Sequence, residues 1–181
     1  SSRTRGQLLH SLAAVLQAAG RLEEAEEALE QARVVLVVRN SRPDRTVASL
    51  LNTLGVLRYS QQRYPAAQAA LAEARRILAR IAGDEDLQFA SVEYNLGVAS
   101  FATGDYHDAR RFLTHALGVR KRLLGTSHPD TAYAQLQMAR ILRQEGQADE
   151  ARRLEKQAEL VLRAHRRKNL LDLSVDASTL G

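Results

Sequence analysis

Histidines are the side chains of this sequence best suited to hold a metal ion or to carry acid–base catalysis. They are His10, His107, His115, His128 and His165. A helix presents two imidazoles to one zinc ion when they are four residues apart, and no two of these histidines have that spacing. No HExxH motif occurs either. We therefore expect no metal and no cofactor.

The other residues and motifs that could carry catalysis are equally few. Five carboxylates cluster in one predicted helix as Glu23, Glu24, Glu26, Glu27 and Glu30, and they are expected to form a solvated helix face rather than a catalytic pair. The chain has no cysteine, which excludes disulfides and thiolate sites. It also lacks the GxGxxG, P-loop and GxSxG motifs. We expect that the chain is not an enzyme, and that catalysis would need a further domain.

Composition bounds the class of protein. Hydrophobic residues make up 45% of the 181 residues and aromatic residues 4%, and the net charge is +5. A basic balance is compatible with nucleic acid or acidic partners, but acidic residues are interspersed with the arginines. No apolar run reaches the roughly 20 residues that a membrane span needs, and no secretory signal is seen. We expect a cytoplasmic fragment of a longer protein that does not insert in a membrane.

Internal repetition places these residues on helices. Gly20, Gln62, Gly104 and Gly146 are spaced by 42 residues. In the same register lie four sets of small or apolar residues. These are Ala25, Ala67, Ala109 and Ala151; Ala32, Ala74, Ala116 and Ala158; Ala13, Gly55, Gly97 and Ala139; and Leu12, Leu54, Leu96 and Met138. Small residues at facing positions let two antiparallel helices approach closely, and glycine in the turn allows a left-handed conformation. Because Gln62 replaces that glycine, we expect strain in the second turn.

Each unit therefore predicts a helix A, a tight turn, a helix B and a linker. The predicted helices are 6–19, 21–39, 45–61, 64–81, 86–103, 106–123, 130–145 and 147–166. The repeats are approximately 6–47, 48–89, 90–131 and 132–166, with residues 1–5 as linker. Breakers mark the linkers at 40–44, 83–84 and 125–130. Asp44 and Asp130 are expected to cap the helices that follow them, and Pro65 falls in the first turn of a helix B.

The pattern resembles the tetratricopeptide repeat. The residues that carry the resemblance are Asn95-Leu96-Gly97, Gly104-Asp105-Tyr106, Ala109, Leu113 and Ala116. The 42-residue unit is similar to that of kinesin light chains, and the stretch 116–132 resembles that family's signature between repeats. The resemblance implies an all-α fold, a right-handed α-α superhelix of four helix-turn-helix repeats, whose A helices line a concave groove. Light-chain repeats often carry paired asparagines in helix A. Only Asn52 and Asn95 remain here, so light-chain cargo specificity does not follow.

One stripe of each A helix faces away from the core stripe. It reads Gln7, His10, Ala14 and Gln17; Ser49, Asn52, Val56 and Tyr59; Ser91, Tyr94, Val98 and Phe101; and Tyr133, Leu136, Arg140 and Arg143. We expect a protein or peptide partner to bind here. The predicted contacts are Asn52, Val56, Tyr59, Ser91, Tyr94, Asn95, Val98, Phe101, Tyr133, Arg140 and Arg143.

In this interpretation an apolar anchor of the partner lies among the aromatic residues, because Tyr and Arg are favoured interface anchors. Acidic residues of the partner would meet Arg140 and Arg143. The alternative is that Tyr94 and Phe101 pack against the neighbouring repeat and contact no ligand. The function predicted is that of an interaction scaffold or adaptor. The alternatives are a self-associating architectural module or a regulatory domain of a larger signalling protein. Nucleic-acid binding is disfavoured because two sections of the stripe are apolar.

The C-terminal segment 167–181 differs from the repeats. The basic cluster His165-Arg166-Arg167-Lys168 complements a helix C-terminus, and Asn169 is expected to end the helix. The residues that follow are apolar and acidic, with no basic residue. Three interpretations stay open for them: a disordered end, a short helix that caps repeat four, or a groove ligand within one molecule or between two.

Overall fold

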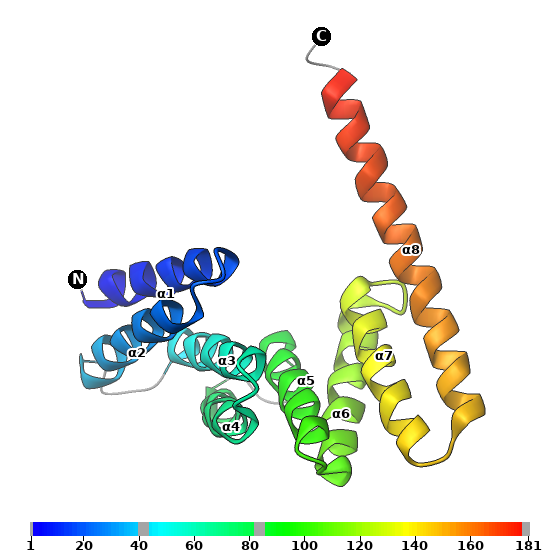
Figure 1. Ribbon diagram of the computed structural model, residues 1–181, viewed down its shortest axis with the longest axis horizontal. Coiled ribbons are helices and arrows are strands. Elements are labelled where there is room, and N and C mark those ends of the chain that lie inside the picture. The colour runs from blue at the N-terminus through cyan, green and yellow to red at the C-terminus, as the bar shows by residue number, and fades with distance from the viewer. Residues whose placement is uncertain (1, 40–43, 82–85, 179–181) are drawn as a thin grey trace.

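The computed structural model describes the backbone of residues 2–39, 44–81 and 86–178, and the side chains of residues 3–36, 44–81 and 86–169. The described chain folds into eight helices, with no strand in these ranges (Figure 1). They are α1 (Ser2–Ala18), α2 (Leu22–Arg39), α3 (Arg45–Ser60), α4 (Tyr64–Ile81), α5 (Leu87–Ala102), α6 (Tyr106–Leu124), α7 (Pro129–Gln144) and α8 (Ala148–Ser178). None of them is long and apolar enough to cross a lipid bilayer.

The helices pair into four antiparallel hairpins, α1–α2, α3–α4, α5–α6 and α7–α8. All four turns have the same hydrogen bonds, as in the third, where Gly104 N–H donates to Phe101 O and Asp105 N–H to Ser100 O. These are the two bonds of a Schellman motif, which needs a left-handed residue after the helix. Gly104 has φ +83°, and Gln62 in the second turn has φ +61°. The predicted strain at Gln62 therefore has a conformational basis.

The small residues in register bring the two helices of each hairpin together. Ala13, Ala25, Ala109 and Ala151 are at most 1% exposed. A methyl group placed on Gly55 would lie 2.5 Å from Leu71 Cγ, so even alanine would not fit without movement there. The predicted all-α hairpin architecture is confirmed, because these contacts recur in every repeat.

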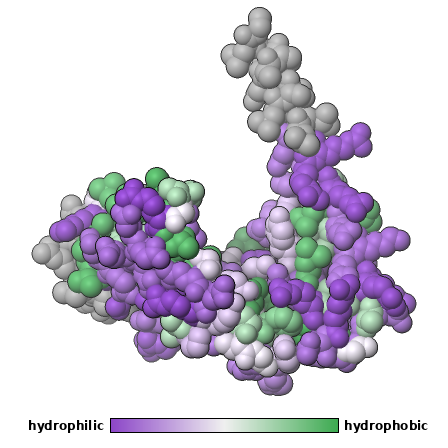
Figure 2. All heavy atoms as spheres, viewed as in Figure 1, coloured by the Kyte–Doolittle hydropathy of each residue, from purple (hydrophilic) through white to green (hydrophobic). Residues whose placement is uncertain are grey.

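Stacking of the hairpins gives the array its curvature. Each A helix approaches the next one closely, as α3 does α5, whereas the backbones of the described B helices (α2, α4, α6 and α8) lie farther apart. Arg75 of α4 reaches α6 through its side chain, with its guanidinium 5.6 Å from the centre of the Phe112 ring. The A helices therefore lie on the inner side of the curve. Figure 2 shows the molecule hollowed between the first hairpin and the last. This geometry creates the concave surface that a superhelix of repeats presents.

Several predicted boundaries differ from the structure. Asp44 caps α3 as predicted, with its side chain accepting from the N–H groups of Thr46 and Val47. The prediction that Asp130 caps the seventh helix is wrong, because His128 is the N-cap and accepts from the Asp130 N–H. Pro129 occupies the first helical position, which its fixed φ favours, so the cap is the residue before it. The breakers at 40–43 and 83–84 lie outside the described residues.

Both ends of the array are more helical than predicted. Helix α1 begins at Ser2 rather than residue 6. The predicted end of the last helix near residue 166, with Asn169 as its stop, is wrong because α8 continues to Ser178. The stretch 163–178 contains no glycine or proline, and Asn169 Nδ2 lies 3.2 Å from His165 Nε2 one turn earlier. Contacts of the side chains at 170–181, on which capping or groove binding would depend, lie outside those described.

Candidate partner-binding surface

A ladder of polar side chains joins successive A helices. His10 Nε2 lies 2.8 Å from Thr53 Oγ1, and Asn95 Nδ2 donates to Asn52 Oδ1 at 2.8 Å. Tyr94 and Gln137 form the third hydrogen bond. Each rung joins a residue to the one 43 positions later, so the rungs recur at every junction. The two asparagines therefore hydrogen-bond to each other across the junction between α3 and α5.

Tyr94 is held inside the protein by several contacts. The Arg120 guanidinium lies 4.3 Å from the centre of the Tyr94 ring, and Arg120 itself is only 7% exposed. Burial raises the pKa of the Tyr94 phenol, although the charge of Arg120 and the hydrogen bond to Gln137 act in the opposite direction. Arg120 also donates to the Asp130 backbone O at 2.9 Å. Tyr94 thus links α5, α6 and α7, and only part of its ring is exposed.

Two other predicted aromatic contacts, Tyr59 and Phe101, are half-buried. Tyr59 packs against the main apolar core and lies 5.3 Å from Tyr64, ring centre to ring centre. Phe101 has the same relation to Tyr106, at 5.2 Å, and the Arg140 guanidinium covers its ring at 4.7 Å. These two pairs recur at the same register in repeats two and three. The aromatic surface that is accessible to a partner is therefore smaller than the sequence alone indicates.

Four predicted contact residues of the A helices remain exposed. Val56 is 36% exposed and Tyr133 is 49% exposed. Arg140 and Arg143 are also exposed; Arg140 donates to Gln137 Oε1, and Arg143 pairs with Glu155 of α8. Ser91, Val98 and the two asparagines are half-buried. The structure thus gathers the predicted residues on adjacent A helices but leaves their surface accessible to different degrees.

The face of α1 that points away from the other hairpins is a second exposed surface. Leu8, Leu12 and Val15 are 65%, 48% and 65% exposed. Leucines at the same register in the second repeat, Leu50, Leu54 and Leu57, are at most 1% exposed because the preceding hairpin covers them. Figure 2 shows hydrophobic surface over this first hairpin.

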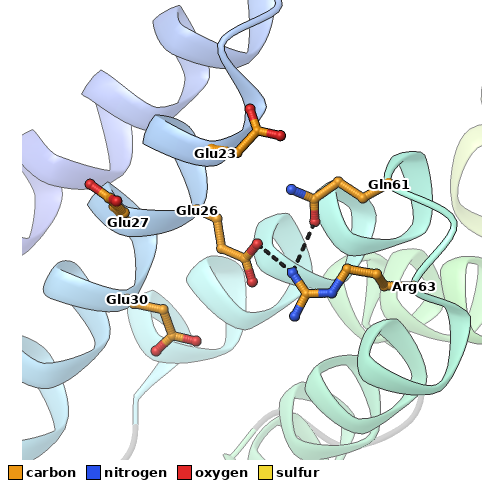
Figure 3. A pocket seen from close by; sticks show the side chains of 6 residues that line it. All are labelled: Glu23, Glu26, Glu27, Glu30, Gln61 and Arg63. Atoms are coloured by element: carbon orange, nitrogen blue, oxygen red, sulfur yellow. Dashed lines mark hydrogen bonds and ion pairs between the residues drawn. The ribbon is translucent and has the colours of Figure 1, made fainter.

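The predicted solvated acidic face of α2 is in part an interface between repeats. A pocket of about 610 Å³ is lined by Glu23, Glu26, Glu27, Glu30, Gln61 and Arg63 (Figure 3). Arg63 Nη1 lies 2.6 Å from Glu26, while Arg58 lies 3.0 Å from Glu26 and 2.7 Å from Glu30. Burial raises the pKa of the Glu26 carboxyl, but hydrogen bonds and the two arginine charges hold the pKa below its ordinary value. These acids join the first hairpin to the second.

Sequence reasoning missed one buried charge cluster. Glu93 is 3% exposed, accepts from Arg75 Nε at 2.8 Å, and hydrogen-bonds His115 Nδ1. The available signal was that Glu93 occupies a register position held by leucine, Leu51, in the preceding repeat. Within the described residues no group of three or more His, Asp or Glu side chains could hold a metal ion.

Comparisons with known proteins agree with the geometry. A family model described as "Tetratricopeptide repeat" matches residues 4–80 and 88–163, and this match indicates no catalytic family. None of the curated proteins compared with the sequence matches it.

Solved structures with the same fold are similar over most of the chain. The crystal structure of BtubC (BKLC) from P. vanneervenii has a TM-score of 0.82 at 22% identity, covering 92% of this chain and 66% of that one. A putative kinesin light chain from Podosopora anserina, with nearly identical TPR-like repeats, has a TM-score of 0.69 at 23% identity, with coverages of 90% and 77%. The Rap conjugation gene regulator of the plasmid pLS20, in complex with the Phr* peptide, has a TM-score of 0.53 at 14% identity, with coverages of 85% and 52%.

Proposed function

Because this chain belongs to the tetratricopeptide repeat family, we propose that it is an interaction scaffold that binds a protein or peptide segment along its A helices. One observation supports this most strongly: Val56, Tyr133 and Arg140 are exposed, and they belong to the A helices α3 and α7. Exposed apolar side chains beside a cation offer a partner both area to bury and a charge to pair. Binding of a peptide by the Rap structure, which shares the fold, is consistent with this use of the surface.

The partner's chemistry follows from what is accessible. An aliphatic or aromatic side chain of the partner packs against Val56 and the half-buried Val98. A neighbouring acid pairs with Arg140, since Arg143 already has Glu155 as its partner. The half-buried asparagines position the partner's backbone at the edge of the ladder. A single short segment of this kind is expected to bind with micromolar affinity, about 8 kcal/mol.

Substitution of the exposed inner residues tests this proposal. The triple variant Val56→Asp, Tyr133→Ala, Arg140→Glu should fold normally, because these side chains are on the surface. Partners recovered with the wild-type chain should bind it about 30-fold more weakly, which corresponds to ~2 kcal/mol, as measured by isothermal titration calorimetry. The matched control is Val34→Asp with Arg76→Glu, at exposed positions on the B helices. Equal binding by the triple variant and the control would show that the partner lies elsewhere.

The exposed face of α1 supports a second candidate function, self-association with another copy of this chain. Leu8, Leu12 and Val15 occupy the register positions that in the second repeat are buried against the preceding hairpin, so a hairpin of another copy could pack on them in the same way. Light scattering should then show a mass that rises with concentration, and Leu8→Asp with Val15→Asp should return the chain to a monomer. A constant monomer mass for the wild-type chain would exclude this function.

A further inference from the structure

A groove on the B-helix side of the array is not explained by a concave binding surface. Helix α7 contacts both α6 and α8, whereas α6 and α8 do not contact each other, so α7 forms the floor between them (Figure 1). Two adjoining cavities of about 440 Å³ and 510 Å³ lie along this line and share Ser127, Leu160 and Val161. We call this continuous cavity the α6–α8 groove.

The floor of the groove contains a buried hydrogen-bond acceptor without a partner. Gln135 is 4% exposed, and its Oε1 has no hydrogen-bond partner among the described residues. One repeat earlier the same position is Glu93, which is bonded to Arg75 and His115. The residues 42 positions after those two partners are Leu117 of α6 and Gln157 of α8. Because an unsatisfied buried acceptor is unfavourable, a ligand that supplies an N–H group there would be bound more tightly.

The walls of the groove combine positive charge with apolar surface. Lys121 and Lys168 line it from α6 and α8, and neither forms an ion pair with any described residue. No Asp or Glu is among the residues that line the two cavities. Leu160 is 60% exposed between them. In contrast, four glutamates line the pocket between the first two hairpins, so the two ends of the array differ in charge.

We propose that the α6–α8 groove is a second binding site, separate from the A-helix surface, for an acidic and aliphatic peptide segment of a partner protein. A backbone N–H of the segment donates to Gln135 Oε1. Its carboxylates pair with Lys121 and Lys168, and an aliphatic side chain packs on Leu160 and Val161. The apolar side chains of Leu160 and Val161 on the α8 wall favour a peptide over a nucleic-acid backbone, which is bound mainly through contacts to its phosphates and sugars.

A synthetic peptide with the sequence of residues 169–181 is a suitable probe, because it carries Asp172 and Asp176 among leucines and has no basic residue. Fluorescence anisotropy with the full chain should give a Kd on the order of 10 μM. A control peptide with Asp172→Asn and Asp176→Asn should bind about tenfold more weakly. No binding of the first peptide at about 1 mM protein, or equal binding of both, would overturn the proposal.

Variants of the chain locate the bound probe. Lys121→Glu with Lys168→Glu should weaken binding about tenfold, while Lys156→Glu should leave it unchanged. Lys156 is the matched control because it is an exposed lysine of α8 that does not line the groove. The Val56→Asp, Tyr133→Ala, Arg140→Glu variant should also bind normally. Loss of the probe in that variant but not in the lysine variant would place the peptide on the A helices and overturn the proposal.

Gln135→Leu separates a binding role from a structural one. It removes an unsatisfied acceptor, so the free chain should melt at a higher temperature, yet it should bind the probe several-fold more weakly. Unchanged affinity would show that Gln135 Oε1 does not contact the peptide, and would contradict this part of the proposal. Sedimentation of the full chain completes the test. A dimer that the two lysine substitutions dissociate would make the occupant a second copy of this chain, contrary to the proposal.

Discussion

Replacing Gly97 by valine should destabilise the third hairpin by about 3 kcal/mol, because α5 and α6 leave no space for a side chain there. A methyl group on Gly97 would lie 2.6 Å from Leu113 Cγ and 3.2 Å from the Ala109 carbonyl O. The second of these atoms belongs to the backbone of α6, so it cannot move unless the helices separate. Valine adds two further methyl groups to the same space. Urea denaturation followed by circular dichroism measures the change in the free energy of unfolding.

Gly118→Val is the control for this prediction. Gly118 lies in α6, and a methyl group placed on it would have no atom within 4 Å. The same substitution there should be neutral or stabilise slightly, because valine favours a helix more than glycine does. If both variants unfold at the wild-type urea concentration, the close approach of α5 and α6 does not determine the stability of the third repeat. Because repeats stabilise their neighbours, the Gly97 variant should also unfold less cooperatively.

Loss of the Glu93 carboxylate should have a comparable effect at the junction between repeats two and three. The carboxylate bridges Arg75 of α4 and His115 of α6, and Arg75 also lies over the ring of Phe89 at 5.2 Å. Glu93→Ala would leave both partners without an acid and open a cavity. We expect a loss of about 3 kcal/mol, at the lower end for buried ion pairs because Arg75 and His115 are about one-third exposed.

Two further variants separate charge from shape at this junction. Glu93→Gln keeps an oxygen that can accept from Arg75, so it should lose only about 1 kcal/mol. Glu73→Ala removes an exposed carboxylate of α4 that lies 3.9 Å from Arg76, and it should change stability by less than about 0.5 kcal/mol. Thermal unfolding of the three variants gives the order of their stabilities. Equal stability of Glu93→Ala and Glu73→Ala would contradict a role for the cluster in joining the repeats.

The repeat pattern was sufficient to predict the helices and their turns. The 42-residue register of small residues located all four hairpins, and Gly20, Gly104 and Gly146 have the positive φ expected of them. These signals are readable because they are local: a turn depends on its own residue, and a close approach depends on two positions a fixed number of residues apart. The prediction of Asp130 as a cap was wrong because the helix already begins at the preceding proline, Pro129, so the N-cap is His128.

Only the packing of the helices, both within and between hairpins, decided which residues of the A helices are accessible. Tyr94 and Phe101 have the right type and spacing for ligand contacts, yet Arg120 and Arg140 cover parts of their rings. Asn52 and Asn95 hydrogen-bond to each other for the same reason. In each case a partner lies on a different helix from the residue it contacts. A periodic sequence determines which way a side chain points from its own helix, whereas the distance between neighbouring helices determines what it meets.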